Sequence, residues 1–330
     1  MIRIEINEER CSGCGICVDF CPTSVLDLVE IEGQKIARAI HPENCWGCDT
    51  CAGQCFQKAI RVGKSPDTAA IDSDTDGSQR SIPFVPLDKD EYAGYIAISE
   101  SLGQLLSLRW KPVAVTLIPR CDPLPPMPVS NVKLRYCQSV MAARQGKTLL
   151  MPPQAHACPD GTYILGLTEL PPKLASGELY LKFGKIASME AARRMIAERP
   201  RLPERSVRAT LVTPLEKPVM RPDVVIITAP PESIMWVCMA SSFYTGKRFL
   251  FKVSGYNAQC VEATLYPLTT GEMNISLGCY GCRASTDISD NEMFIGVPLV
   301  KLPSLVEGLE ELGKKAIPDA RSKIYLPPSI

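Results

Sequence analysis

A repeated cysteine pattern constrains this chain more than any other feature of its sequence. Four cysteines recur with the same spacing after 34 residues, as Cys11, Cys14, Cys17 and Cys21 and then as Cys45, Cys48, Cys51 and Cys55. In each copy an alternating apolar–polar stretch precedes the cysteines and a short apolar stretch follows them, which predicts a strand on either side. Residues 1–63 are therefore expected to form an α+β module of two pseudo-twofold related βαβ units.

The spacing within each copy fits an iron–sulfur cubane. Three cysteines at three-residue steps on a tight loop can wrap one [4Fe–4S] cluster, while the fourth, where the next helix starts, points toward a second cluster. We expect two such clusters, one held by Cys11, Cys14, Cys17 and Cys55 and the other by Cys45, Cys48, Cys51 and Cys21. Zinc is the main alternative, but four-cysteine zinc sites use two Cys-x2-Cys pairs, not this longer run.

The module resembles the two-cluster bacterial ferredoxins. This resemblance implies an electron carrier that transfers single electrons at low potential. One position departs from the family pattern, because Phe56 follows Cys55 where proline is usual. The module transforms no substrate by itself, so the use of its electrons depends on the rest of the chain.

Composition limits the classes of partner. Residues 64–82 are small and polar and are expected to be a flexible linker, followed by a second domain over residues 83–330. Residues 1–63 carry a net charge of −3 and residues 83–330 one of +5, which favours electrostatic docking, although a chance offset is the alternative. Neither domain is strongly basic, no apolar run reaches ~18 residues, and the charged N-terminus is no signal peptide. We therefore expect a cytoplasmic protein with no nucleic-acid partner and no membrane partner.

The second domain alternates between helical and strand-like patterns. Helices are predicted over residues 90–109, 131–145, 189–199, 233–244 and 306–315. Strands are predicted over residues 112–118, 148–151, 207–212, 224–228, 248–253 and 273–277. This alternation is typical of a mixed α/β layered domain, whose strand order the sequence does not reveal.

Four cysteines of the second domain lie at poor core positions. Cys137 has polar neighbours on a predicted helix, Cys158 is in a Cys-Pro turn, and Cys279 and Cys282 form a glycine-bracketed Cys-x2-Cys after a predicted strand. Together these four are candidate ligands of a third [4Fe–4S] cluster. Reactive or structural thiols are the alternative.

Several segments around these cysteines resemble the uncharacterised family called domain of unknown function 169. They include Pro112–Val115, the Cys158-Pro159 segment through Leu167, and Cys279-x-Gly281-x-Arg283 with the residues up to Pro298. The resemblance brings no known activity. It implies cysteines at positions 137, 158 and 279, with another residue often at 282, so that three ligands would leave one iron open to substrate.

Other side chains complete the candidate site. His156, two residues before Cys158, is a candidate proton donor or ligand, with a solvated loop histidine as the alternative. Arg283 is a candidate for binding an anionic substrate, with a surface ion pair as the alternative. The arginine-rich segment 193–208 is a candidate docking patch for an acidic electron carrier, or an ordinary solvated face.

Two functions follow. In the first, the chain is a ferredoxin-dependent reductase whose head accepts electrons from a protein donor, such as a ferredoxin, a flavodoxin or an oxidoreductase, and passes them to a small-molecule substrate in the second domain. In the second, the chain is a non-enzymatic carrier or electron-transfer subunit that docks onto a partner oxidoreductase. A third cluster favours the enzyme, and wholly structural cysteines favour the carrier.

Overall fold

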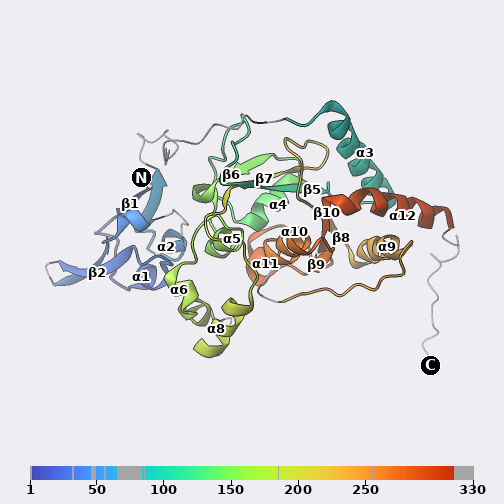
Figure 1. Cartoon of the computed structure of the whole chain (residues 1–330). Helices are drawn as coiled ribbons and strands as arrows, with labels where there is room; N and C mark the ends of the chain where they lie inside the picture. The colour runs from blue at the N-terminus through green and yellow to red at the C-terminus, as the bar shows by residue number, and fades with distance from the viewer. Residues whose placement is uncertain are drawn as a thin grey trace, which may run out of the picture. The chain divides into compact units, whose positions relative to one another are not determined.

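The computed structural model describes residues 2–31, 33–45, 50–55, 57–64, 84, 86–184, 186–254, 256 and 258–315 (Figure 1). Contacts between Cα atoms divide the chain into two compact units. The first comprises residues 1–86, 115–142 and 148–212, and the second comprises residues 87–114, 143–147 and 213–330. The linker expected over residues 64–82 lies almost wholly outside the described residues, so the boundary at residue 83 stays a prediction.

The N-terminal module contains two antiparallel strand pairs. Its elements are β1 (Ile2–Ile6), α1 (Ile16–Phe20), β2 (Leu26–Ile31), β3 (Gln34–Ala39), η1 (Pro42–Asn44), α2 (Thr50–Gly53) and β4 (Ile60–Lys64). β1 pairs with β4, with Ile2 opposite Lys64, and β2 pairs with β3, with Leu26 opposite Ala39. Because β1 and β2 come from the first repeat and β3 and β4 from the second, each pair joins one strand of each copy.

The rest of the described chain mixes helices and strands, as expected for the α+β class. In chain order the elements are α3 (Lys89–Leu105), β5 (Val113–Pro119), α4 (Tyr136–Arg144), β6 (Leu149–Met151), η2 (Pro153–Ala155), α5 (Pro159–Ile164), α6 (Pro172–Ala175), α7 (Glu178–Lys182), α8 (Met189–Glu198), β7 (Val207–Pro214), β8 (Val224–Ala229), α9 (Pro231–Ser242), η3 (Val261–Leu265), α10 (Tyr266–Thr270), β9 (Asn274–Ser276), α11 (Tyr280–Ser285), β10 (Met293–Pro298), η4 (Leu299–Lys301) and α12 (Leu302–Lys315).

Six of these strands form one sheet in the order β6-β7-β5-β8-β10-β9. β8 and β10 are antiparallel, with Ile227 opposite Ile295, and β10 is also antiparallel to β9. β6 and β7 are antiparallel at the other end of the sheet. Every residue of β8 is buried, which explains why its sequence is a continuous apolar run rather than an alternating one.

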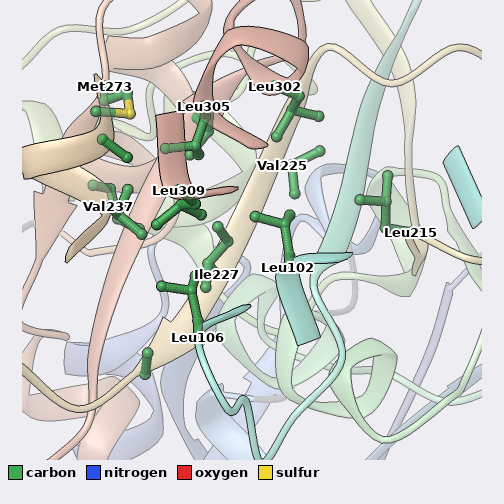
Figure 2. Packing of buried hydrophobic residues seen from close by; sticks show 14 of the residues in the cluster. Leu102, Leu106, Leu215, Val225, Ile227, Val237, Met273, Leu302, Leu305 and Leu309 are labelled. Atoms are coloured by element: carbon green, nitrogen blue, oxygen red, sulfur yellow. The ribbon is translucent and has the colours of Figure 1, made fainter. Parts of the chain in front are cut away.

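The core of the second unit lies between helices and the β8–β10 strands. Leu102 and Leu106 from the α3 region, Val237 from α9 and Leu305 from α12 pack on Val225 and neighbouring strand residues, as Figure 2 shows. Leu102, Val225, Val237 and Leu305 have no solvent exposure. Burial of such side chains stabilises the fold by ~1.5–3 kcal/mol each.

One predicted strand is wrong. Residues 248–253 form no strand, and Leu250 is 91% exposed. The side chain of Asn274 replaces a strand ladder here, because its Oδ1 accepts from Lys252 N at 2.8 Å and its Nδ2 donates to Lys252 O at 3.0 Å. The helix predicted from residue 131 begins at Tyr136, since Leu134 forms an isolated bridge with His156 instead.

Within the part of the chain that the structure describes, no helix is long and apolar enough to cross a membrane.

Candidate iron–sulfur and thiol sites

Six of the N-terminal cysteines lie in or against the apolar interior of their module, whereas Cys14, a predicted ligand, is exposed. Cys17, Cys21 and Cys51 are buried among residues that include Val25 and Ile60, and Cys11, Cys45 and Cys55 pack against this cluster. Cys48, a predicted ligand, lies outside the described residues. An apolar enclosure limits solvent access to thiolate-bound iron, which is one way in which a protein sets the potential of a cluster.

Two backbone hydrogen bonds to sulfur repeat with the sequence period. Val25 N donates to Cys21 Sγ at 3.2 Å, and Ala59 N donates to Cys55 Sγ at 3.3 Å. Both donors lie four residues after their cysteine, and the pairs are related by the 34-residue offset of the repeat. N–H groups directed at sulfur suit a thiolate that binds iron and help tune its potential.

The thiols that influence the pKa of Cys17 are the other three members of one predicted ligand set. Burial raises the pKa of the Cys17 thiol to about 11, the Val18 N–H opposes this, and the charges of Cys11, Cys14 and Cys55 raise it further. These four thiols form the set predicted from the spacing, including the exchanged Cys55. Four thiolates repel one another unless positively charged iron lies between them, so this donor set fits an iron–sulfur cluster.

The first cysteine loop also requires a residue without a side chain. Gly13 has a φ of +66°, and a Cβ at this position would lie 2.2 Å from the carbonyl oxygen of Lys35. The backbone can follow this path only with glycine, which keeps the loop close to β3. Gly47, the equivalent residue in the second copy, is outside the described residues.

The module contacts two short helices within the first unit. Lys173 Nζ in α6 donates to Val18 O at 2.5 Å, and Lys182 Nζ in α7 lies 2.9 Å from Asp19 Oδ1. The rings of Phe20 and Phe183 are 4.9 Å apart between centroids. All three contacts involve α1, the helix that contains Cys17 and is capped by Cys21.

Cys137 and Cys158 lie close together in the first unit. Cys137 is buried in the first turn of α4, and Cys158 is the N-cap residue of α5. Burial raises the pKa of Cys158 to about 12, and the charges of Asp160 and Cys137 add to this effect. A thiol in these surroundings is inert unless a metal or another reagent draws off its proton.

A buried polar network follows Cys158. Arg199 Nη1 donates to Asp160 Oδ1 at 3.0 Å, to Tyr163 Oη at 2.9 Å and to Tyr180 Oη at 2.7 Å. Tyr180 also donates to Asp160. Arg199 was part of the candidate docking patch, but its side chain is only 2% exposed, so this residue does not belong to a surface patch.

His156 is neither solvated nor charged. It is buried, and its Nε2 lies 3.2 Å from both Met151 O and Thr210 Oγ1. Burial lowers the pKa of His156 to about 4, so the imidazole is neutral at physiological pH. Its Nδ1 has no hydrogen-bond partner among the described residues. A role as an imidazolium acid is therefore disfavoured, and a catalytic role stays a prediction.

Arg283 is engaged with the backbone of its own loop. Its Nε, Nη1 and Nη2 donate to the carbonyl oxygens of Leu277, Ser289 and Glu292 at 2.9, 3.0 and 2.9 Å. These bonds fix the segment around the Cys-x2-Cys. Most of the guanidinium is thereby committed, which leaves little of it for a substrate anion.

Cys279 and Cys282 are neighbours in the second unit. The Cys279 thiol donates to Cys282 Sγ at 3.2 Å, and Cys282 N donates to Cys279 Sγ at 3.4 Å. The Cys282 thiol also donates to Gln259 Oε1 at 3.4 Å. The structure thus brings Cys137 within electrostatic range of Cys158 and hydrogen-bonds Cys279 to Cys282. The joining of these two pairs in one metal site stays a prediction.

Two residues near Cys279 were not anticipated from the sequence. Gln259 and Glu262 are both fully buried. Burial raises the pKa of Glu262 to about 7, the Ser254 N–H and the Ser276 hydroxyl oppose this, and the charge of Cys279 raises it further. The available signal was weak: Glu262 is the only charged residue of the segment Val261–Leu265, where apolar residues stand on either side of it.

Comparisons with known proteins define the class of each part. The model of the 4Fe–4S dicluster domain matches residues 10–59, so the N-terminal part is a ferredoxin-type domain for [4Fe–4S] clusters and electron transfer. The model of the uncharacterised ArCR family, domain of unknown function 169, matches residues 101–308. This second match covers more than half of the chain, and the chain belongs to that family.

Relatives match the two parts separately. The uncharacterised protein MJ0308 of Methanocaldococcus jannaschii is 29% identical over 215 residues, which cover 64% of this chain and 92% of that protein. The uncharacterised ferredoxin MJ0722 of the same organism is 38% identical over 61 residues, 18% of this chain and 78% of that protein. The indolepyruvate oxidoreductase subunit IorA of Pyrococcus horikoshii is 38% identical over 66 residues, 18% of this chain and 9% of that protein.

Proposed function

We propose that this protein is a ferredoxin-dependent reductase. Its N-terminal domain accepts single electrons from a donor protein and passes them to a reductive site in the C-terminal domain, where a small molecule is reduced. The observation that carries this proposal is the contact of α1 with α6 and α7 through Lys173, Lys182 and Phe183. A carrier that transfers electrons only to other proteins does not need a contact between its cysteine-bearing helix and the C-terminal domain.

The proposal includes two clusters with exchanged ligands in a pseudo-twofold module. Cys11, Cys14, Cys17 and Cys55 would hold one cluster, and Cys45, Cys48, Cys51 and Cys21 the other. The repeated N–H···S hydrogen bonds at Cys21 and Cys55 support equivalent roles for these two residues. When bound, the clusters supply one electron at a time at low potential. The chain's own residues enclose the sulfurs and direct N–H groups at them.

The reductive site is proposed to be built on the cysteines of the C-terminal domain. One form is a third [4Fe–4S] cluster with Cys137, Cys158 and Cys279 as ligands and Cys282 as a fourth candidate. Buried Cys137 next to Cys158 supports the first two ligands. His156 and Arg283 remain candidates for assisting the substrate, although both are already engaged by Met151 and by the 277–292 loop.

Iron and sulfide analysis of the full-length protein, purified without oxygen, tests the cluster count. Two cubanes give about eight iron atoms per chain, and a third gives about twelve. With a third cluster, Cys137→Ser and Cys158→Ser should each lower the content toward eight. Zinc in place of iron, or about four iron atoms in total, would contradict the assignment of the module.

Transfer into the C-terminal domain is tested by reoxidation of the reduced protein. Full-length protein reduced with stoichiometric dithionite should lose its reduced-cluster spectrum faster when an acceptor site is intact than in a variant lacking it. Cys158→Ser and Cys279→Ser are the test variants, and Cys121→Ser, at an exposed cysteine, is the matched control. Equal reoxidation rates in the unmodified protein and all three variants would contradict the reductase.

A non-enzymatic electron-transfer subunit is the second candidate. The similarity of residues in the N-terminal domain to a part of the oxidoreductase subunit IorA favours it. A subunit predicts that reduced full-length protein keeps its electrons until a partner oxidoreductase is added, with the same rate in the Cys158→Ser variant. The reoxidation experiment therefore separates the two functions.

A further inference from the structure

The Cys-x2-Cys of the second unit has the geometry of a reduced dithiol. The two sulfur atoms are 3.2 Å apart, and a protein disulfide bond is ~2.05 Å long, so closure requires a movement of only about 1 Å. The loop is rigidly supported, because Arg283 ties its backbone to Leu277, Ser289 and Glu292. The hydrogen bonds of Arg283 thus support the loop that carries the two thiols, whether or not a disulfide bond joins them.

The two thiols are not equivalent. Cys279 is partly accessible, and its Sγ accepts a hydrogen bond from Cys282 N, which stabilises a thiolate once the proton has left. Cys282 is only 5% exposed and donates its thiol proton to Gln259 Oε1. An accessible sulfur stabilised as a nucleophile beside a buried partner is the arrangement that thiol–disulfide exchange requires.

Two buried polar atoms next to the pair lack partners. Gln259 Nε2 and Glu262 Oε2 make no hydrogen bond with the described residues. Leaving such an atom unsatisfied costs ~1–3 kcal/mol, so two polar groups are kept beside the two thiols at a cost in stability. Both belong to the segment around the π-helix η3, a backbone form that is frequent at functional sites.

A tetrahedral metal site needs four ligands, and Cys279 and Cys282 supply two. The side chain that Cys282 contacts, Gln259, is an amide and not one of the usual metal-binding groups. The surface beside Cys279 is partly apolar, since Leu277 is 47% and Tyr280 76% exposed.

We infer that Cys279 and Cys282 form a redox-active dithiol whose substrates are disulfides. Cys279 attacks a substrate disulfide, one substrate sulfur leaves as a thiol, and a mixed disulfide forms. Cys282 then attacks Cys279 Sγ and releases the second substrate thiol. In total, two protein thiols become one disulfide, one substrate disulfide becomes two thiols, and the two protons end on the departing sulfurs. Gln259 is a positioning residue that holds the Cys282 thiol toward Cys279.

Regeneration of the dithiol rests on the proposed function. The Cys279–Cys282 disulfide takes up two electrons and two protons, and the ferredoxin-type domain supplies the electrons one at a time. In this form of the reductive site the thiols themselves are the acceptor, so the assignment competes with the third cluster for Cys279. Cys137 and Cys158 are not required for the exchange.

Trapping with oxidised glutathione tests the inference on the full-length protein without oxygen. Treated protein should yield a Cys279–Cys282 disulfide in peptide mass spectrometry, with one glutathione disulfide consumed per chain. Cys282→Ser should instead accumulate glutathione on Cys279, and Cys279→Ser should form no adduct at Cys282. Exposed Cys121 is the internal reference, because it lies outside the Cys-x2-Cys and is expected to carry a stable glutathione adduct.

The positioning role of Gln259 has a separate readout. Gln259→Leu should slow the second step, release of the mixed disulfide, by about tenfold while leaving the rate of the first attack within twofold. A purely structural role would change both steps together or neither. Gln259→Glu keeps an acceptor oxygen for the Cys282 thiol and should restore most of the second rate.

Two results would overturn the dithiol. One is a loss of about four iron atoms in Cys279→Ser, which would make this residue a cluster ligand. The other is recovery of both Cys279 and Cys282 as alkylatable thiols after a glutathione treatment that modifies Cys121. Failure of the proposed function looks different, because the disulfide would still form with glutathione but would not accelerate reoxidation of the reduced N-terminal domain.

Discussion

The N-terminal module and the second unit surround cysteine in different ways. In the module most of the described sulfurs lie among apolar residues such as Val25 and Ile60, and backbone N–H groups donate to Cys21 and Cys55. In the second unit Cys279 also accepts a backbone N–H, but the two thiols hydrogen-bond to each other, and Cys282 donates to a buried side chain, Gln259, near a carboxyl group. The difference therefore lies in the side-chain partners, which the second unit adds to a backbone donor.

The largest expected difference between the two regions comes from Gly13. Gly13→Ala places a Cβ against the Lys35 carbonyl oxygen and should destabilise the module by about 5 kcal/mol, with loss of most of the iron. Gly33→Ala is the matched control, because Gly33 also has a positive φ but open space around it, and it should cost about 1 kcal/mol. Iron content and urea unfolding measure both. Retention of iron in Gly13→Ala would show that the loop can move away from β3.

In the second unit, loss of one buried charge should lower the free energy of unfolding more than loss of an exposed one. Arg144 is fully buried, pairs with Glu292 at 3.2 Å and lies 4.3 Å from the centroid of the Trp110 ring. Arg144→Met leaves Glu292 without its cation and should lower the free energy of unfolding by about 3–4 kcal/mol, with the iron content unchanged. The control is Arg194→Met, which breaks an exposed pair with Glu190 and should cost under about 0.5 kcal/mol. Similar effects from both variants would contradict this ranking.

A pH dependence should also separate the regions. Because the pKa of Glu262 is about 7 in the folded chain against an ordinary 4.5, the folded state holds a proton between these values that the unfolded state has released. Stability from this group is therefore complete below pH 4.5 and falls by about 2–3 kcal/mol as the pH rises to 7. Glu262→Gln should flatten the slope in urea titrations at pH 5, 6 and 8 followed by tryptophan fluorescence. A slope that persists in the variant would assign the effect elsewhere.

The smallest effect is expected where the module contacts α7. Lys182 bonds to Asp19 and Glu178, but both carboxylates are substantially exposed. Lys182→Ala should change the free energy of unfolding by less than about 1 kcal/mol, and the change should shrink further in 0.5 M salt. Lys314→Ala, which removes another exposed pair, is the reference. A larger loss at Lys182 would mean that this contact, rather than chain connectivity, holds the module in place.

The sequence predicted the module far better than the second unit, for a physical reason. Cluster ligands three residues apart are a local pattern, and strands on either side follow from local alternation. The helix capped by Ser188 was likewise predicted, because Ser188 Oγ accepts from Ala191 N within one turn. β10 was missed, because Gly296 and Pro298 interrupt its apolar run and both residue types are depleted in strands.

Partners that are distant in sequence escaped prediction, because local sequence patterns carry no information about them. Gln259 and Cys282 are joined by a hydrogen bond across 23 residues, and Arg199 reaches Asp160 across 39. Arg199 looked like one cation among many in an arginine-rich segment, and only packing shows that it is buried. Cys279 and Cys282 were found from their spacing, but whether they act as metal ligands or as a dithiol depends on neighbours that spacing does not reveal.

Asn274 has a consequence for the solubility of the whole chain. β9 is the last strand of its sheet, and the adjacent segment 248–253 is rich in phenylalanine and other β-forming residues, with Phe249 stacked on Phe251. Such a segment beside an open edge is a template for intermolecular β-pairing and aggregation. The two hydrogen bonds from one amide side chain hold Lys252 in a non-strand conformation at that edge. Asn274 therefore opposes intermolecular strand pairing at this edge. Substitution of Asn274 should first cause precipitation during expression rather than a change in redox chemistry.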